Sequence, residues 1–231
     1  MKYSLLTLIF LTFIACSEPK VISEPKSLPQ VKQLKVAVID TGLDLEDKRF
    51  KDILCKEGHV DFSHTGIKDT NGHGTHVTGL IKRYSNLKNY CVVILKYSNI
   101  DNYLQAIQYS SKNDFDIVNI STSGNSYIPE ERQFIRESKA IYVIAAGNNR
   151  DNFNRHFPGA FYYFSNVYTI GSIDNSGHVS KTSNYGEGLN WEVGEKVSSD
   201  SLIGGETVMS GTSQATAIFT GKLINRILAG K

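Results

Sequence analysis

From residue 34 onward, short apolar runs alternate with longer segments whose apolar residues recur at helical spacing. The short runs are rich in β-branched residues, which favour strands that are buried on both faces of a sheet. They occupy residues 34–39, 92–95, 117–120, 141–145 and 167–170. Because strands that alternate with helices form parallel sheets, the pattern predicts an α/β fold: a doubly wound, mostly parallel sheet with helices on both faces.

Three of the intervening segments predict helices. Asp101 is a good N-cap for one helix, and Pro129 suits the first turn of a second. Residues 213–228 predict a buried helix near the carboxyl end of the chain. The free N–H groups and the dipole of this last helix would point to the place where Ser213 lies, so negative charge could be stabilised there.

The amino-terminal end predicts export. Lys2 precedes an apolar run at residues 5–15 that is too short to span a bilayer, so residues 1–15 are expected to form a signal peptide. The run ends in Phe-Ile-Ala-Cys, which resembles a bacterial lipobox with Cys16 as the lipidation site; an ordinary secretory signal is the alternative. Residues 16–33 would then be the lipidated cysteine and a Pro-rich linker, and residues 34–231 the folded domain, tethered by lipid to a membrane of the cell envelope.

Composition narrows the function classes. The chain has 231 residues, 40% of them hydrophobic, which suits one domain with a sizeable core, and we expect a monomer. The formal net charge is only +2 and the basic residues are scattered, so no surface for nucleic acid is indicated.

Three glycine-flanked segments supply an acid, a base and a nucleophile in the order Asp40, His73 and Ser213. The segments read VAVIDTG at 36–42, NGHGTHVTG at 71–79 and SGTSQAT at 210–216. Asp-Thr-Gly also occurs in aspartic proteases, but these need two facing copies and this chain has one. His73 and His76 could begin a metal site, but no HExxH-type motif or cysteine-rich set of further ligands accompanies them. No metal site is therefore expected.

These segments, their order and the intervening pattern over nearly all of residues 34–228 resemble the subtilisin-like serine proteases, the subtilases of peptidase family S8. The resemblance implies a serine endopeptidase that hydrolyses polypeptides without a cofactor: Asp40 orients His73, His73 takes the proton of Ser213, and Ser213 forms an acyl-enzyme. It also implies that Asn148, in Ala-Ala-Gly-Asn, donates a hydrogen bond in the oxyanion hole.

Substrate contacts are implied for one further segment. Ser121, Thr122, Ser123 and Gly124 resemble the strand that runs beside the substrate and forms a wall of the primary specificity pocket. The family has glycine where Ser123 stands, so we expect a narrower pocket. The resemblance also implies that a calcium-binding loop of many relatives is deleted here between Lys82 and Tyr90. Arg49 stands about where a calcium-binding aspartate would be, so no calcium is expected at that position.

Two cysteines remain, Cys55 and Cys91. In the family the strands next to them lie side by side, so the resemblance implies a disulfide; two buried thiols are the alternative. Gln214 and Ala217 replace the methionine and proline that the family usually has after the nucleophile. These departures leave open a catalytically degenerate relative that binds peptides without cutting them, although the retained acid, base, nucleophile and oxyanion donor favour catalysis.

Overall fold

A computed structural model describes residues 32–230. Its centre is a parallel sheet of seven strands in the order β2-β3-β1-β4-β5-β6-β7. The strands are β1 (Leu34–Asp40), β2 (Val60–Asp61), β3 (Tyr90–Lys96), β4 (Ile117–Ile120), β5 (Ile141–Ala145), β6 (Val167–Ile173) and β7 (Asn190–Val193). The five predicted strands are confirmed as β1 and β3 to β6, and the parallel sheet brings their carboxyl ends to one edge.

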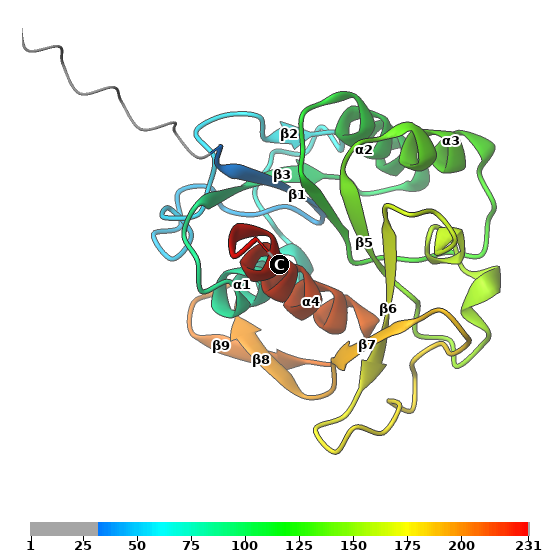
Figure 1. Ribbon diagram of the computed structural model, residues 1–231. Helices are drawn as coiled ribbons and strands as arrows, with labels where there is room; N and C mark the ends of the chain where they lie inside the picture. The colour runs from blue at the N-terminus through cyan, green and yellow to red at the C-terminus, as the bar shows by residue number, and fades with distance from the viewer. Residues whose placement is uncertain (1–31, 231) are drawn as a thin grey trace, which may run out of the picture. The chain divides into compact units, whose positions relative to one another are not determined.

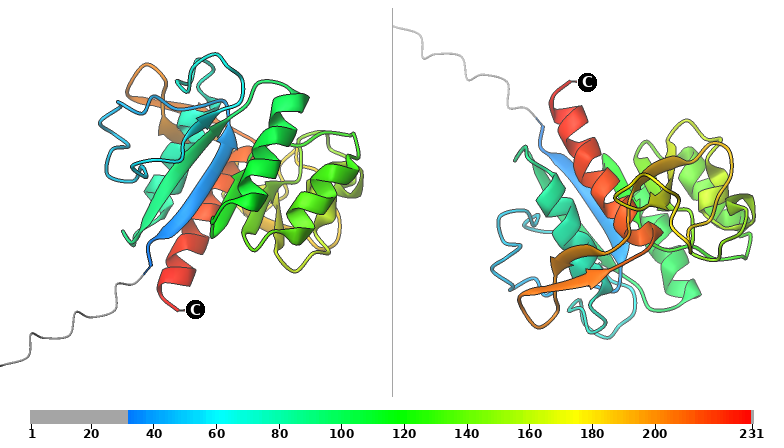
Figure 2. Two further views of the ribbon diagram at one scale, coloured as in Figure 1. Left: turned by 90° about the horizontal axis from the view of Figure 1, so that it is seen from above. Right: turned by 90° about the horizontal axis from the view of Figure 1, so that it is seen from below.

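Helices cover both faces of this sheet, as Figures 1 and 2 show. Helices α1 (His73–Tyr84) and α4 (Thr212–Leu228) pack together on one face, and α2 (Ile100–Lys112) and α3 (Pro129–Glu137) pack together on the other. Side chains of β1 alternate between two apolar cores: Val36 and Val38 enter the core under α1 and α4, and Ala37 and Ile39 enter the core under α2. The doubly wound α/β fold is therefore confirmed.

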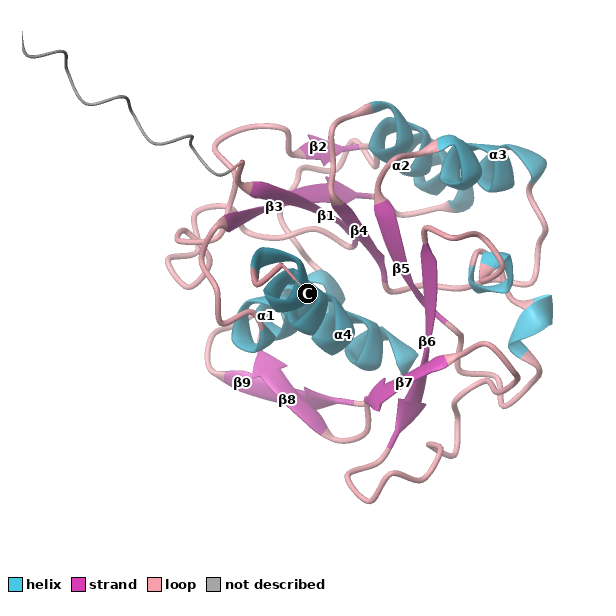
Figure 3. Cartoon of the chain, viewed as in Figure 1, coloured by secondary structure: helices cyan, strands magenta, loops and turns pink. Residues whose placement is uncertain are grey.

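Several short elements lie outside the predicted pattern. Strands β8 (Val197–Asp200) and β9 (Glu206–Met209) form an antiparallel hairpin next to α1, apart from the main sheet (Figure 3). Two short 3₁₀ helices, η1 (Phe153–Arg155) and η2 (Gly159–Phe161), follow β5. These elements are short, and the strands of the hairpin are partly exposed, so no continuous apolar run marks them.

One predicted helix boundary is wrong. Helix α2 begins at Ile100, and its N-cap is Asn99 rather than Asp101. The Asn99 side chain accepts hydrogen bonds from the backbone N–H groups of Asp101 and Asn102, and the Asn102 side chain accepts one from the Asn99 backbone in return. This reciprocal capping satisfies more backbone donors than Asp101 alone could, so the helix starts earlier. Pro129 is confirmed as the first residue of α3.

Cys55 and Cys91 form a disulfide in the structure, across 36 positions of sequence. Cys55 directly follows Leu54, which forms a bridge with Val92 of β3, so the two cysteines face each other beside the edge of the sheet. The implied pairing is thus present.

The expectations for the amino-terminal end, namely the signal peptide at 1–15, the lipidation of Cys16 and most of the linker at 16–33, lie outside the described residues. Among the residues from 32 to 230, no helix combines the length and the apolar character that crossing a bilayer requires.

Candidate active site

Asp40, which is buried, and His73, which is partly exposed, form an acid–base pair. Asp40 is the last residue of β1 and His73 is the first residue of α1. The Nδ1 atom of His73 lies 2.7 Å from the Oδ1 atom of Asp40, which also accepts the backbone N–H of Thr41 at 2.7 Å. The negative charge of the Asp40 carboxylate, only 3% exposed, raises the pKa of His73 above its ordinary value, against the opposing effect of burial. The Asp40 contact leaves the second ring nitrogen, Nε2, available for proton transfer.

Asp69 holds this pair in place, although no sequence motif marks it. Its Oδ1 accepts hydrogen bonds from the Thr41 hydroxyl and from the backbone N–H groups of Asn71 and Gly72. Its Oδ2 accepts from the backbone and hydroxyl of Thr75 in the first turn of α1. Burial opposes ionisation of Asp69, but these bonds outweigh it and hold the pKa of Asp69 below its ordinary value. The carboxylate therefore ties the end of β1 to the start of α1.

Ser213 lies in the first turn of α4, after Gly211, whose φ of 150° no β-branched or bulky residue readily adopts. Its side chain is 8% exposed. The Ser213 hydroxyl donates a hydrogen bond to the backbone carbonyl of Ser121 at 2.8 Å, and the Ser121 hydroxyl donates to the Ser213 carbonyl at 3.2 Å. The nucleophile candidate is thus bonded to the segment after β4, and within the described residues no hydrogen bond joins its hydroxyl to His73.

Asn148 follows β5 and presents its amide next to the start of α4. Its Oδ1 accepts hydrogen bonds from the backbone N–H of Thr212 at 2.9 Å and from the Thr212 hydroxyl at 3.1 Å. Because the carbonyl oxygen is fixed in this way, the NH₂ group of Asn148 faces away from Thr212 and remains a free donor among the described residues. A Cβ atom on Gly211 would lie 3.2 Å from the Asn148 Nδ2, so glycine keeps this donor accessible.

Asn184 supports the loop that carries Asn148, and sequence patterns did not identify it either. Its Oδ1 accepts the backbone N–H groups of Asn149 and Asp151, and its Nδ2 donates to the Ala146 carbonyl at 2.8 Å. Asn184 is fully buried. These bonds fix the loop on both sides of Asn148.

A test of Asn148 follows from this geometry. We expect Asn148→Ala to lower kcat by about 10²- to 10³-fold with little change in KM, because the donor acts on charge that develops only in the transition state. The matched control is Asn149→Ala, which changes an exposed neighbouring side chain. Steady-state kinetics on one peptide substrate would check this, and equal rates for the two variants would contradict the assignment.

The segment 121–124 extends β4 beyond the sheet. The backbone N–H and C=O of Gly124 pair with those of Phe157 at 2.8 and 2.7 Å. Neighbouring residues of an extended segment point their peptide groups in opposite directions, and within the described chain those of Ser123 have no hydrogen-bond partner. Ser123 therefore offers a donor and an acceptor to an added strand. Its hydroxyl extends toward Gly147 and would lie 2.7 Å from a Cβ atom there.

The two residues after the nucleophile that differ from the family pattern, Gln214 and Ala217, are packed in the protein interior. Gln214 is 2% exposed, with its Nε2 near the Met209 sulfur, and Ala217 is fully buried in α4. His76 is also buried and its Nε2 faces the carbonyls of Val197 and Thr207, which suits a structural role.

No metal-binding group appears in the part of the chain that is described, counting clusters of at least three His, Cys, Asp or Glu side chains. Arg49 pairs with Asp47 and Asp200, so its guanidinium neutralises these two carboxylates.

Comparisons with known proteins identify the family to which this chain belongs. The sequence profile of the Subtilase family (peptidase S8) matches residues 31–224. The minor extracellular protease Epr of Bacillus subtilis (strain 168) is 30% identical over 203 residues, which are 80% of this chain and 30% of that protein. The intracellular serine protease of Paenibacillus polymyxa is 29% identical over 216 residues, which are 82% of this chain and 65% of the relative. This chain thus spans less than two thirds of both relatives.

Solved structures show the same fold. A cold-adapted subtilisin-like serine proteinase superposes with a TM-score of 0.74 at 24% identity, covering 86% of this chain and 76% of that one. The nisin leader peptidase NisP from Lactococcus lactis superposes with a TM-score of 0.72 at 19% identity, covering 87% and 79%. With the family profile spanning most of the sequence, the chain belongs to the subtilase family of serine proteases.

Proposed function

We propose that this chain is a serine endopeptidase in which Asp40, His73 and Ser213 form the catalytic triad. The observation that carries the proposal is the 2.7 Å contact between the buried Asp40 carboxylate and His73 Nδ1, at the edge of the sheet where Asn148 and Ser213 also lie. The contact fixes the imidazole so that Nε2 is the basic nitrogen, which is the requirement for a general base.

The reaction starts when the Ser213 hydroxyl leaves the Ser121 carbonyl and turns to His73. His73 takes the hydroxyl proton as Ser213 Oγ attacks the substrate carbonyl carbon. The Asn148 NH₂ group and the backbone N–H of Ser213 hold the resulting oxyanion. His73 then protonates the leaving nitrogen and the C–N bond breaks. Water, deprotonated by His73, attacks the ester; the acid product leaves and Ser213 recovers its proton.

The substrate in this proposal is an extended polypeptide. The unpaired peptide groups of Ser123 support it, because an added strand can bond to them while Gly124 stays paired with Phe157. Incubation of the purified full-length chain with unfolded casein tests the proposal, with fragments separated by mass. We expect internal cuts at neutral to alkaline pH; intact casein with a folded protein would refute endopeptidase function.

One observation favours a second function, peptide binding without cleavage. The Ser213 hydroxyl is engaged with Ser121 rather than with His73, as it would be in a site that never activates its serine. In that case the folded protein would bind casein-derived peptides and leave them intact in the same experiment.

We further propose that the protein is held at a bacterial membrane through lipid on Cys16, supported by the lipobox-like sequence Phe-Ile-Ala-Cys after an apolar run. Cys16→Ala should move the protein from the membrane fraction to the soluble fraction of expressing cells. Cys16→Ala that still sediments with membranes and still carries lipid would contradict this proposal, whereas both forms being soluble would indicate an ordinary secretory signal.

A further inference from the structure

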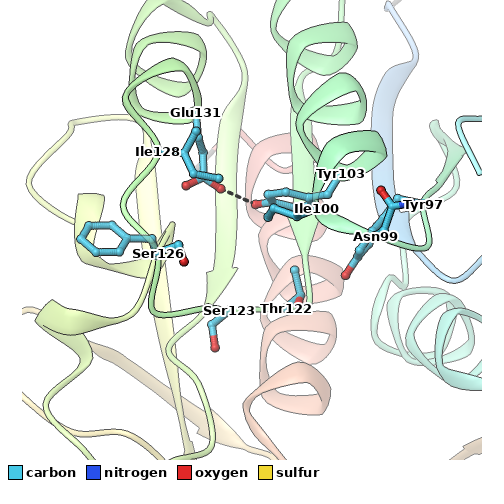
Figure 4. A pocket seen from close by; sticks show the side chains of 11 residues that line it. Tyr97, Asn99, Ile100, Tyr103, Thr122, Ser123, Ser126, Ile128 and Glu131 are labelled. Carbon is cyan, nitrogen blue, oxygen red and sulfur yellow. Dashed lines mark hydrogen bonds between the residues drawn. The ribbon is translucent and has the colours of Figure 1, made fainter.

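A pocket opens beside the segment that we assign to substrate binding, between the start of α2 and the start of α3. Its volume is about 230 Å³. Figure 4 shows Tyr103 from α2, Glu131 from α3 and Thr122 from the segment after β4 around it. Thr122, Ser123 and Gly124 belong to its lining, so a peptide that pairs with this segment can place a side chain in the pocket.

The pocket contains a buried carboxyl group. Glu131, in the first turn of α3, is 2% exposed. Its Oε1 accepts a hydrogen bond from the hydroxyl of Tyr103 on α2 at 2.6 Å (Figure 4). The second oxygen, Oε2, has no hydrogen-bond partner among the described residues, and the lining includes no Lys, Arg or His. The carboxyl group therefore faces the pocket without a counter-charge.

The rest of the lining is mostly uncharged and partly apolar. Tyr97, Ile100 and Phe157 provide surfaces that suit an aliphatic stem, and Glu131 provides a charged acceptor. Lysine and arginine combine such a stem with a cationic head, and a buried carboxylate is stabilised by a cation that also donates hydrogen bonds.

We propose, on the basis of the endopeptidase function argued above, that Glu131 is a specificity-determining residue that selects substrates placing a lysine or arginine side chain in this pocket. The stem of that side chain lies along the apolar lining, and its head pairs with the free Oε2. Tyr103 positions the carboxyl group through the bond to Oε1.

The ionisation of Glu131 supports this selection. Burial raises the pKa of Glu131 to about 7, and the bond from Tyr103 only partly offsets this. Inside the pocket the groups that face it are the neutral phenols of Tyr97 and Tyr103. Asp101 and Glu130 line a separate hollow between α2 and α3. A bound cation favours the carboxylate, so selection strengthens as pH rises through 7 and weakens as pH falls.

Arg132, the residue after Glu131, does not supply the missing charge: its guanidinium donates to the Tyr163 hydroxyl and lies over the ring of Phe164.

The test compares pairs of fluorogenic peptides that differ only by lysine or norleucine, at each position before the cut in turn. We expect one position at which kcat/KM at pH 8 favours lysine by about 10- to 100-fold, the range for a hydrogen bond to a charged group. Glu131→Gln should bring this ratio close to one. The matched control Glu130→Gln, in the same helical turn but exposed, should leave it unchanged. The ratio cancels the titration of His73, because both peptides use the same triad.

The outcomes separate the two proposals. Failure of the wild type to cut any peptide would refute the endopeptidase function. Cleavage without a preference for lysine at any position, or a preference that persists in Glu131→Gln, would overturn the role of Glu131. If Glu131→Gln does not fold, the wild type alone decides: a lysine-to-norleucine ratio that stays constant from pH 6 to 8 would overturn the proposal.

Discussion

Ser213→Ala is expected to reduce kcat for peptide hydrolysis by about 10⁶-fold, the loss seen when the same nucleophile is removed from another Asp-His-Ser protease. The reason is that the covalent acyl-enzyme route is lost, while the Asp40–His73 pair and the Asn148 donor stay in place. The measurement is single-turnover hydrolysis of a fluorogenic peptide, with the background hydrolysis rate subtracted.

The control for Ser213→Ala is Ser210→Ala, which removes an exposed hydroxyl three residues earlier in the same motif. It should retain most activity, since its role is to accept the backbone N–H of Lys196. Activity that survives in Ser213→Ala would show that another residue is the nucleophile. Unchanged peptide affinity in Ser213→Ala would meanwhile show that the fold and the substrate groove remain intact.

Asp40→Asn is expected to lower kcat by about 10⁴-fold at neutral pH, because an amide at this position favours the wrong tautomer of the histidine. The pH profile should change as well. Catalysis needs neutral His73, so activity falls as pH drops through the pKa of His73, which Asp40 raises above the ordinary value of 6.5. Without the Asp40 charge, the acidic limb of the profile should move to lower pH.

The pH dependence of kcat in wild type and Asp40→Asn measures this shift. Asp44→Asn is the control: it removes a carboxylate that follows β1 and pairs with Lys68, outside the site. An acidic limb at the same pH in Asp40→Asn and wild type would mean that Asp40 does not act on the general base.

The sequence predicts the sheet well where strands are buried on both faces. Strands such as β1 and β4 are continuous apolar runs, so their pattern is visible without a structure. Strand β7 contains Asn190 and Glu192, and its pairing comes from β6 rather than from its own composition. The start of α2 differs from the prediction because two asparagine side chains cap each other, an interaction that single-residue preferences do not describe.

The residues of the candidate site likewise divide into those that the sequence reveals and those that only the structure reveals. Asp40, His73, Asn148 and Ser213 stand in recognisable motifs, so the sequence alone could propose them. Asp69, Asn184 and Glu131 are isolated polar residues whose roles depend on backbone groups or helices that become their neighbours only after folding. Burial of a polar side chain is the signal that reveals them, and burial cannot be read from an isolated residue in a sequence.

A fluorophosphonate probe tests most directly whether folding creates an activated serine at residue 213. The full-length protein would be treated at pH 8, digested, and analysed by mass spectrometry to locate the phosphonyl adduct. We predict a single adduct on Ser213 that forms more slowly as pH drops through the pKa of His73 and is absent in Ser213→Ala. A folded protein that remains unlabelled from pH 6 to 9, or that is labelled at a different residue, would contradict this account.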